Sequence, residues 1–382
     1  MSDPFRVLII GGSGVFGSRL ARLAADEPGV ELTLAGRTVA KLEAVAAGLA
    51  PRPAVLQLDR NAVDPKHLAP FDLVIDAAGP FQASQAQVIV AALASKTPYV
   101  DLADGRQFVA DFPAFDDAAK RCGVSLVTGA SSIPALSHAV LDRMTSGWRG
   151  IDDIRIGIYP GNRAPRGLSV VEAILSYVGK PVRVFREGGW QEVPGWGMTH
   201  REEIVGIGRR WASVCDTPEQ DLLVRRYRPR RSAEFFAGLE LGILHCGLAL
   251  CAQPVRLGWL ASLRPFAKAM LAVSRLFLPF GSDKGAMTVL ARGEDGAGRP
   301  IEARWTLRAD ANRGPNVPVL AALAMIRRFR DGWAPEPGAH VCAGMLGLHE
   351  FEADMAKLGI VHTLEEVHGC ASEALTPLAK AA

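Results

Sequence analysis

Three glycines near the start of the chain have a spacing that suits the binding of a pyrophosphate. Gly12, Gly14 and Gly17 match the pattern G-x-G-x-x-G. In such a turn the first glycine permits a tight bend, the second lets the backbone approach the phosphates, and the third lets a helix pack closely on a strand. Unpaired N–H groups at the positive end of that helix favour the anion. We therefore predict a dinucleotide-binding turn made of Gly12, Ser13, Gly14, Val15, Phe16 and Gly17.

The residues on either side of this turn predict the elements that must position it. The apolar run Val7–Ile10 is typical of a buried parallel strand, and Ser18–Ala24 has the apolar spacing of a helix. An isolated glycine pattern is weak, but the strand before it and the helix after it are the context that the motif requires. The alternative is an ordinary glycine-rich turn between a strand and a helix.

The end of the second expected strand, 31–35, bears on which nucleotide binds. An NAD site usually carries Asp or Glu at this place, where the carboxylate binds the ribose 2′-hydroxyl. Here Gly36 and Arg37 follow the strand, and Lys41 lies one helical turn further on. Arg37 can bind a 2′-phosphate through a charge-assisted pair. We therefore predict NADP in preference to NAD, with Gly36, Arg37 and Lys41 in the site. The alternative is that Arg37 is a solvated residue at a strand end.

Two further segments belong to the predicted cofactor site. Asp59 closes a third strand, 54–58, where it either lies near the adenine or caps the next turn. The fourth strand, 73–75, is expected beside the first, so the loop after it faces the middle of the dinucleotide. Small residues in this loop leave room for the cofactor, a proline fixes it, and a phenylalanine offers an apolar wall. These loop residues are Ala78, Gly79, Pro80 and Phe81.

Strand and helix patterns alternate six times between the N-terminus and residue 130. This alternation is typical of an α/β fold with a doubly wound parallel sheet. We therefore expect a Rossmann domain over residues 1–130.

Three motifs in this region resemble the saccharopine dehydrogenase-like family. They are Asp76–Phe81, Tyr99–Leu102 and Gly129–Pro134, and the most specific are the A-G-P-F turn and the Y-V-D-L strand. The resemblance implies an NADP-type Rossmann domain joined to an α+β second domain, and a C-terminal segment that returns to cover the first domain. Many members carry G-E shortly after the Y-V-D-L strand, whereas this chain has Asp104–Arg106 there. A catalytic role for that glutamate is therefore not carried over.

The second part of the chain has the patterns of a largely antiparallel sheet. Two pairs of alternating segments flank glycine-rich turns and predict hairpins. These segments are 182–185 with 190–193, and 287–292 with 301–307. We expect residues 131–315 to form an α+β domain that binds substrate and makes a homodimer. Residues 316–382 are expected to be a helical segment that packs on the Rossmann domain.

Two residues are candidates for catalysis. In a nicotinamide enzyme the cofactor carries the hydride, so the protein supplies orientation and at most one proton donor. Asp101 lies at a strand end and His138 on the helix that connects the two domains, so both are placed to reach a cleft. The alternatives are that Asp101 caps a turn and that His138 is a hydrogen-bonded helix residue.

Composition narrows the class of protein. The 382 residues carry a formal net charge of +3 and are 49% hydrophobic, which disfavours disorder and nucleic-acid binding. The six cysteines form no C-x-x-C pair, so we expect reduced thiols, no metal site and a cytoplasmic protein. No signal peptide is visible at the N-terminus. The basic run Arg225–Arg231 is expected to be a solvated loop.

Residues 235–280 are unusually apolar. Charged residues such as Glu240 and Lys268 interrupt the stretch, so a membrane span is not expected. We expect a buried helix and the wall of an apolar pocket. The alternative is peripheral membrane contact, because six apolar residues recur at helical spacing. They are Leu260, Leu263, Phe266, Ala267, Met270 and Leu271.

These patterns predict an NADP-dependent oxidoreductase that transfers hydride to or from a small molecule. Apolar residues of the second domain would not compensate the desolvation of three carboxylates, so saccharopine is not the expected substrate. A small or lipid-derived carbonyl, imine or activated alkene is expected instead. The alternative function is a nucleotide-binding protein without turnover, such as a membrane-associated scaffold.

Overall fold

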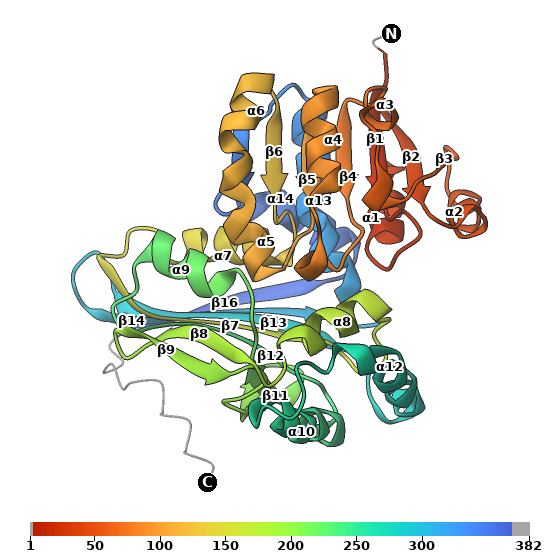
Figure 1. The fold of residues 1–382 in the computed structure, drawn as a ribbon. Coiled ribbons are helices and arrows are strands. Elements are labelled where there is room, and N and C mark those ends of the chain that lie inside the picture. Colours follow the sequence, from red (N-terminus) through yellow and green to blue (C-terminus); the bar gives the residue numbers. More distant parts are fainter. Residues whose placement is uncertain (1–2, 369–382) are drawn as a thin grey trace. The chain divides into compact units, whose positions relative to one another are not determined.

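The chain forms two compact units, each built from two separate stretches of sequence. The computed structural model describes residues 3–368. Unit 1 combines Met1–Leu136 with Pro315–Phe351, and unit 2 combines Ser137–Gly314 with Glu352–Ala382 (Figure 1). The segment 316–382, expected to lie wholly on the Rossmann domain, is thus divided between the two units.

Unit 1 contains a seven-stranded sheet whose neighbouring strands are all parallel. The strands are β1 (Phe5–Ile10), β2 (Val30–Gly36), β3 (Ala54–Gln57), β4 (Leu73–Asp76), β5 (Tyr99–Asp101), β6 (Ser125–Thr128) and β15 (Gly338–Val341). Their order is β15-β6-β5-β4-β1-β2-β3. The strand order reverses between β1 and β4, where ligands bind in open sheets of this kind. The predicted α/β fold with a doubly wound parallel sheet is confirmed.

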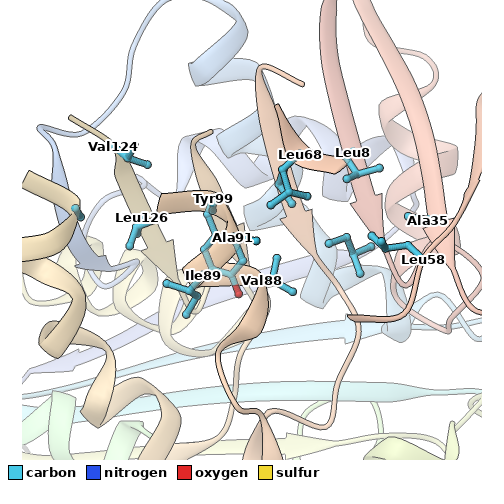
Figure 2. Packing of buried hydrophobic residues seen from close by; sticks show 14 of the residues in the cluster. Leu8, Ala35, Leu58, Leu68, Val88, Ile89, Ala91, Tyr99, Val124 and Leu126 are labelled. Atoms are coloured by element: carbon cyan, nitrogen blue, oxygen red, sulfur yellow. The ribbon is translucent and has the colours of Figure 1, made fainter. Parts of the chain in front are cut away.

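Helices cover both faces of this sheet. Those of unit 1 are α1 (Gly17–Ala24), α2 (Val39–Ala46), α3 (Pro65–Leu68), α4 (Gln87–Ser95), α5 (Arg106–Asp111), α6 (Asp116–Cys122) and α13 (Val317–Arg330), and the division between the units falls within α14 (His349–Lys357). Residues of α4 and α6 pack with β1, β4, β5 and β6 in one buried apolar cluster that includes Leu8, Val88 and Tyr99 (Figure 2). This core holds the carboxyl ends of the strands in place.

The stretch after residue 315 completes unit 1. Helix α13 packs on α1, and ten of its residues are buried. Strand β15 adds a parallel seventh strand beside β6. Strand β15 was not predicted, because its four residues Gly-Ala-His-Val carry little strand signal of their own.

Unit 2 contains a larger, mostly antiparallel sheet. The strands are β7 (Gly150–Tyr159), β8 (Pro181–Arg186), β9 (Gly189–Pro194), β10 (His200–Ile204), β11 (Gly208–Val214), β12 (Ser232–Ala237), β13 (Gly285–Glu294), β14 (Pro300–Ala309) and β16 (Val361–His368). Both predicted hairpins, β8–β9 and β13–β14, are present. Only the β12–β7 pair is parallel among the described pairs of this sheet. The predicted largely antiparallel second domain is confirmed.

The helices of unit 2 fall into two groups. Helices α7 (Ser137–Met144) and α9 (Glu219–Tyr227) pack on the sheet, α7 against β13 and β14 and α9 against β12. The second group consists of α8 (Leu168–Tyr177), α10 (Gly242–Cys251), α11 (Gln253–Arg256) and α12 (Ala267–Leu276). The apolar stretch 235–280 begins within β12, to which Phe235 and Phe236 belong.

Strand β16 contradicts the prediction that the C-terminal segment 316–382 is helical and packs on the Rossmann domain. It pairs antiparallel with β14 and forms an edge of the sheet in unit 2. Val361, Thr363 and Glu365 alternate along β16 and lie on one face of the sheet. The strand is placed in unit 2 by its backbone pairing with β14.

Candidate nucleotide site

The glycine-rich turn joins the end of β1 to the start of α1 at the switch point of the sheet. Gly11 has a φ of +81°, a conformation that side chains with a Cβ rarely adopt. Gly11 therefore makes the tight bend that the sequence analysis assigned to Gly12. At Gly12 the need for glycine is steric, because a Cβ there would lie 2.9 Å from the Cβ of Leu34 on β2.

The other two glycines have different surroundings. A Cβ at Gly17 would overlap the carbonyl oxygen of Gly11, so α1 reaches this close to the turn only with glycine at its first position. A Cβ at Gly14 would meet one atom within 4 Å, the carbonyl oxygen of Gly11 at 3.1 Å. Side-chain volume is therefore excluded at Gly17 by the protein itself, whereas at Gly14 the space is otherwise open to a ligand.

The backbone of the turn presents unpaired donors. Within the described residues, the amides of Ser13, Val15 and Phe16 donate to no protein acceptor. They precede α1, an eight-residue helix without a side-chain cap. A cluster of free amides at the positive end of a helix dipole is a ready anion site. The turn therefore fits a pyrophosphate by both its steric room and its donors.

Arg37 and Lys41 lie beyond the end of β2, and both are exposed. Neither forms an ion pair with any carboxylate in residues 3–368. The carbonyl oxygen of Arg37 accepts a hydrogen bond from the side chain of Gln57 at the end of β3, 3.3 Å away. Gly36 is the last residue of β2. The guanidinium is thus free for a ligand while its backbone is tied to the neighbouring strand.

The loop after β4 contacts the glycine-rich turn. A Cβ on Gly11 would lie 3.0 Å from the backbone of Ala77 and Ala78, so the two segments are in close contact. Gly79 and Pro80 continue this loop. Phe81 is buried, with its ring 4.8 Å from the guanidinium carbon of Arg60. Phe81 therefore packs inside unit 1, and its role as an apolar wall of the cofactor site stays a prediction.

Asp59 adopts the capping role that was one of its two predicted alternatives. Its Oδ1 accepts a hydrogen bond from the amide of Asn61 at 3.0 Å, at the start of the short helix η1 (Arg60–Ala62). The side chain is exposed. Contact with an adenine stays a prediction.

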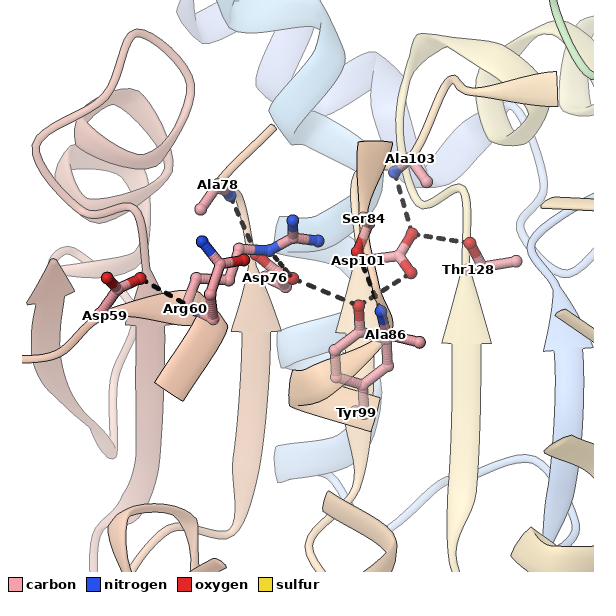
Figure 3. Close-up of polar contacts among 11 residues, drawn as sticks. Asp59, Arg60, Asp76, Ala78, Ser84, Ala86, Tyr99, Asp101, Ala103 and Thr128 are labelled. Atoms are coloured by element: carbon pink, nitrogen blue, oxygen red, sulfur yellow. Dashed lines mark hydrogen bonds and ion pairs between the residues drawn. The ribbon is translucent and has the colours of Figure 1, made fainter. Parts of the chain in front are cut away.

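A buried polar network connects the ends of β4, β5 and β6 (Figure 3). Arg60 donates to Asp76 Oδ2 at 2.7 Å, and the hydroxyl of Tyr99 lies 3.5 Å from the same oxygen. Tyr99 donates to Asp101 Oδ2 at 3.0 Å. The other oxygen of Asp101 accepts hydrogen bonds from the amides of Ala103 and Gly129, both at 2.9 Å, and from the hydroxyl of Thr128 at 2.8 Å.

Burial dominates the electrostatics of this network. Asp101 has no exposed surface, and burial raises its pKa from 3.8 to about 7 against the opposing effect of its hydrogen bonds. Burial also raises the pKa of Asp76, although the guanidinium of Arg60 counteracts it. Asp101 therefore ties the ends of β5 and β6 together, and its side chain is enclosed by protein groups. This is the capping alternative to the catalytic role predicted for it.

The second catalytic candidate, His138, is completely buried in unit 2. Its Nε2 lies 3.2 Å from Glu219 Oε2, and Ser137 donates to the other oxygen of that carboxylate. The ring of Tyr227 lies 5.2 Å from the imidazole. Among the described residues, His138 Nδ1 has no hydrogen-bond partner. His138 thus ties α7 to α9, and a catalytic role stays a prediction.

A protein-family model matches the first part of the chain. The saccharopine dehydrogenase NADP-binding domain matches residues 7–140. Residues 7–140 are thus similar to this domain family. No curated protein sequence matches the chain. Among the solved structures similar to the chain are two that share its fold over most of its length. Saccharopine dehydrogenase (L-Glu forming) from Saccharomyces cerevisiae is 13% identical, with a TM-score of 0.66 and coverage of 95% of this chain and 100% of that one. Homospermidine synthase from Legionella pneumophila in complex with NAD is 12% identical, with a TM-score of 0.57 and coverage of 95% and 91%.

Three residues that shape the turn and the buried network of unit 1 were not predicted as site residues. Gly11 was detectable, because Gly11 and Gly12 both follow β1 directly and the motif uses only Gly12 of these two. Asp76 was detectable as a carboxylate that ends a buried strand. Arg60 carried no signal, since it reaches Asp76 from a short helix sixteen residues earlier in the chain. In the described residues no group of three His, Cys, Asp or Glu side chains could hold a metal ion.

Proposed function

We propose that this protein is an NADP-dependent oxidoreductase. One observation carries the proposal: a turn with three free amides at the switch point of the sheet lies beside β2, and the residue that follows β2, Arg37, forms no ion pair within the described residues. The amides suit a pyrophosphate, and Arg37 suits a 2′-phosphate. The family match over residues 7–140 supports the same cofactor class.

The roles of this chain's residues follow from the fit. NADP(H), when bound, supplies or accepts the hydride. The amides of Ser13, Val15 and Phe16 would hold the pyrophosphate, and Arg37 with Lys41 would hold the 2′-phosphate. Asp101 would act as a positioning residue, because its hydrogen bonds fix the backbone at Ala103 and Gly129.

For the substrate we propose a small or lipid-derived carbonyl, imine or activated alkene. A substrate with three carboxylates needs free arginines, preferably bidentate ones. Three of the five arginines in the run 225–231 already form ion pairs with carboxylates of the protein. Arg226 pairs with Asp142 at 2.8 Å, and Arg230 pairs with Glu294 at 2.7 Å. These pairs support a less polar substrate.

A second function deserves its own test, because both catalytic candidates are completely buried. A nucleotide-binding protein without turnover would need neither of them exposed. Binding alone would not distinguish this function from an oxidoreductase, whereas turnover would.

The experiment has two steps. Titration of the protein with NADPH, followed by nicotinamide fluorescence, is expected to saturate at a lower concentration than titration with NADH. A panel of aldehydes, ketones, imines and enones is then tested for NADPH oxidation, with saccharopine and its precursors included. Binding with turnover of a less polar compound supports the proposal. Binding without turnover of any compound favours the second function, and a specific rate with saccharopine contradicts the substrate class.

A further inference from the structure

Residues 242–280 of unit 2 present large apolar side chains to solvent. This segment was expected to be a buried helix and a pocket wall, and that expectation is wrong for much of it. Trp259, Leu276 and Phe280 are 75%, 73% and 74% exposed. The other exposed large apolar residues of the segment are Ile243, Leu250, Leu257, Leu260, Phe266 and Val273. Isolated apolar residues on a surface need no explanation, but this concentration does.

Helix α12 shows that the exposure is organised. Its exposed apolar residues are Ala269, Ala272, Val273 and Leu276, which follow the spacing i, i+3, i+4, i+7 of one helix face. Of the stripe predicted for a membrane surface, Leu263, Ala267 and Leu271 are buried, whereas Leu260 and Phe266 are 37% and 48% exposed. The helix is therefore apolar on two sides, and one of them faces solvent.

Helix α10 repeats the arrangement. Ile243, Cys246 and Leu250 are exposed at the spacing i, i+3, i+7, while His245 and Leu248 are buried on the other side. Two helices with solvent-facing apolar stripes are thus joined by a segment that carries Trp259.

The charges of this region all have one sign. Between residues 241 and 282 the sequence contains no Asp or Glu, and it contains Arg256, Arg264, Lys268 and Arg275. All four cations are exposed. In residues 3–368 none of them forms an ion pair, in contrast to Arg226 and Arg230 of the basic run 225–231. The exposed apolar surface therefore carries uncompensated positive charge.

The region is held to the rest of unit 2 by specific contacts. Asn162 donates to the carbonyl oxygen of Phe277 at 2.7 Å, and Ser262 donates to that of Leu175 on α8 at 3.2 Å. Helix α12 also packs on α8. The apolar stripes are therefore presented by a fixed scaffold.

We propose that α10, residues 257–266, α12 and Phe280 form a docking face for the surface of an anionic phospholipid bilayer. Apolar and aromatic side chains flanked by cations suit the boundary between headgroups and acyl chains. Anionic headgroups would compensate the four free cations. No helix in the described residues is long and apolar enough to cross a membrane, so the contact is peripheral.

Charge decides between a bilayer and a second copy of this chain. In an isologous pair each subunit presents the same patch to the other. The four cations of one docking face would then meet the four cations of its partner, with no acidic side chain of residues 241–282 to separate them. An anionic lipid surface avoids this repulsion.

Vesicle sedimentation tests the apolar part of the proposal. The full chain is mixed with vesicles of phosphatidylcholine alone or of phosphatidylcholine with phosphatidylglycerol, and is expected to sediment mainly with the anionic ones. Leu276→Glu is expected to abolish sedimentation. Val205→Glu is the matched control, because Val205 is an exposed apolar residue of unit 2 outside the docking face. Circular dichroism and thermal unfolding establish that both variants fold.

A second pair of variants tests the charges. Replacement of Arg264 and Lys268 by glutamine is expected to lower vesicle affinity roughly fivefold for each cation removed. Replacement of Arg22 and Arg121, exposed arginines of unit 1, is expected to leave it unchanged. The emission of Trp259 should shift to the blue on vesicle binding, and Trp259→Phe should remove that shift.

Three outcomes overturn the proposal. They are failure of the wild-type chain to bind anionic vesicles, equal binding of Leu276→Glu, and a lipid-free dimer that Leu276→Glu dissociates without any vesicle binding. The last result would assign the face to self-association. Vesicle binding is measured without nucleotide, so failure of the NADP assignment would leave this test intact.

Discussion

Arg37 is the residue on which the choice of cofactor depends. It is the first cation after β2, it is exposed, and no carboxylate of the described residues neutralises it. A free guanidinium binds a phosphate strongly, whereas it gains little from the ribose hydroxyl of NAD.

We therefore expect Arg37→Ala to weaken NADPH binding about 10- to 100-fold, because a hydrogen bond to a charged group contributes about 1.5–3 kcal/mol. NADH affinity should change little. Fluorescence titration with both nucleotides measures this, and Arg22→Ala serves as a control, since Arg22 is exposed and lies outside the turn. Equal losses for NADPH and NADH would contradict the assignment.

Gly14 tests the pyrophosphate contact. Gly14→Val should reduce affinity for both nucleotides at least about tenfold, because the side chain fills space that the ligand needs. Circular dichroism should show a folded protein. Gly48→Val is the control, because a Cβ at Gly48 makes only an ordinary contact, 3.6 Å from the carbonyl oxygen of Val45. Undiminished binding by the Gly14 variant would reject the site.

The raised pKa of Asp101 predicts that the stability of the protein depends on pH. Its pKa is raised from 3.8 to about 7, so between these values the folded state binds more protons than the unfolded state. Its contribution to the free energy of unfolding is then present at acidic pH and falls as the pH rises towards 7, by at most about 1.4 kcal/mol per pH unit. Urea unfolding of wild type and Asp101→Asn across this range should show that the variant lacks this component. Parallel pH profiles would show that Asp101 is ionised throughout.

At the scale of elements, α13 is held to the end of α1 by an ion-pair cluster. Glu27, just after α1, accepts from Arg327 at 2.6 Å and from Arg330 at 3.2 Å. The carboxylate side chain is only 12% exposed, so the pair is screened less than a surface pair.

We expect Glu27→Ala to lower the free energy of unfolding by about 1–2 kcal/mol, between the values typical of surface and buried pairs. Glu43→Ala is the matched control. It removes an exposed pair with Arg52, and its effect should stay within about 0.5 kcal/mol. Urea denaturation midpoints provide the comparison, and equal effects of the two substitutions would show that Glu27 adds nothing to the docking of α13.

At the scale of the whole molecule, each unit is discontinuous in sequence. Unit 1 needs residues 315–351 for α13 and β15, although the family model ends at residue 140. In α13, Leu320, Leu323 and Ile326 are almost completely buried.

A fragment of residues 1–136 is therefore expected to be unfolded or aggregated, because it exposes the surface that α13 and β15 cover. Co-expression with residues 315–351 should restore a folded unit that binds NADPH. Circular dichroism and nucleotide titration test both expectations. A stable, nucleotide-binding fragment 1–136 would show that the second stretch is dispensable.

Local patterns of the sequence were enough to predict much of this architecture. The apolar runs at 7–10 and 73–75 identified β1 and β4, because strands buried on both faces need continuous apolar residues. The glycine spacing located the turn between β1 and α1, and the turns at 187–189 and 293–299 located two hairpins. These features arise from residues close together in the chain, so a single sequence displays them.

Features that depend on distant residues emerged from the folded chain. The pairing of Arg60 with Asp76 and the place of β15 beside β6 join residues whose relation no local pattern encodes. Helical spacing marked an apolar face on residues 260–271, but α12 has two such faces, and periodicity cannot tell which one is covered. Burial is a property of the surroundings of a helix, so the exposure of Leu276 was visible only once the neighbours of α12 were in place.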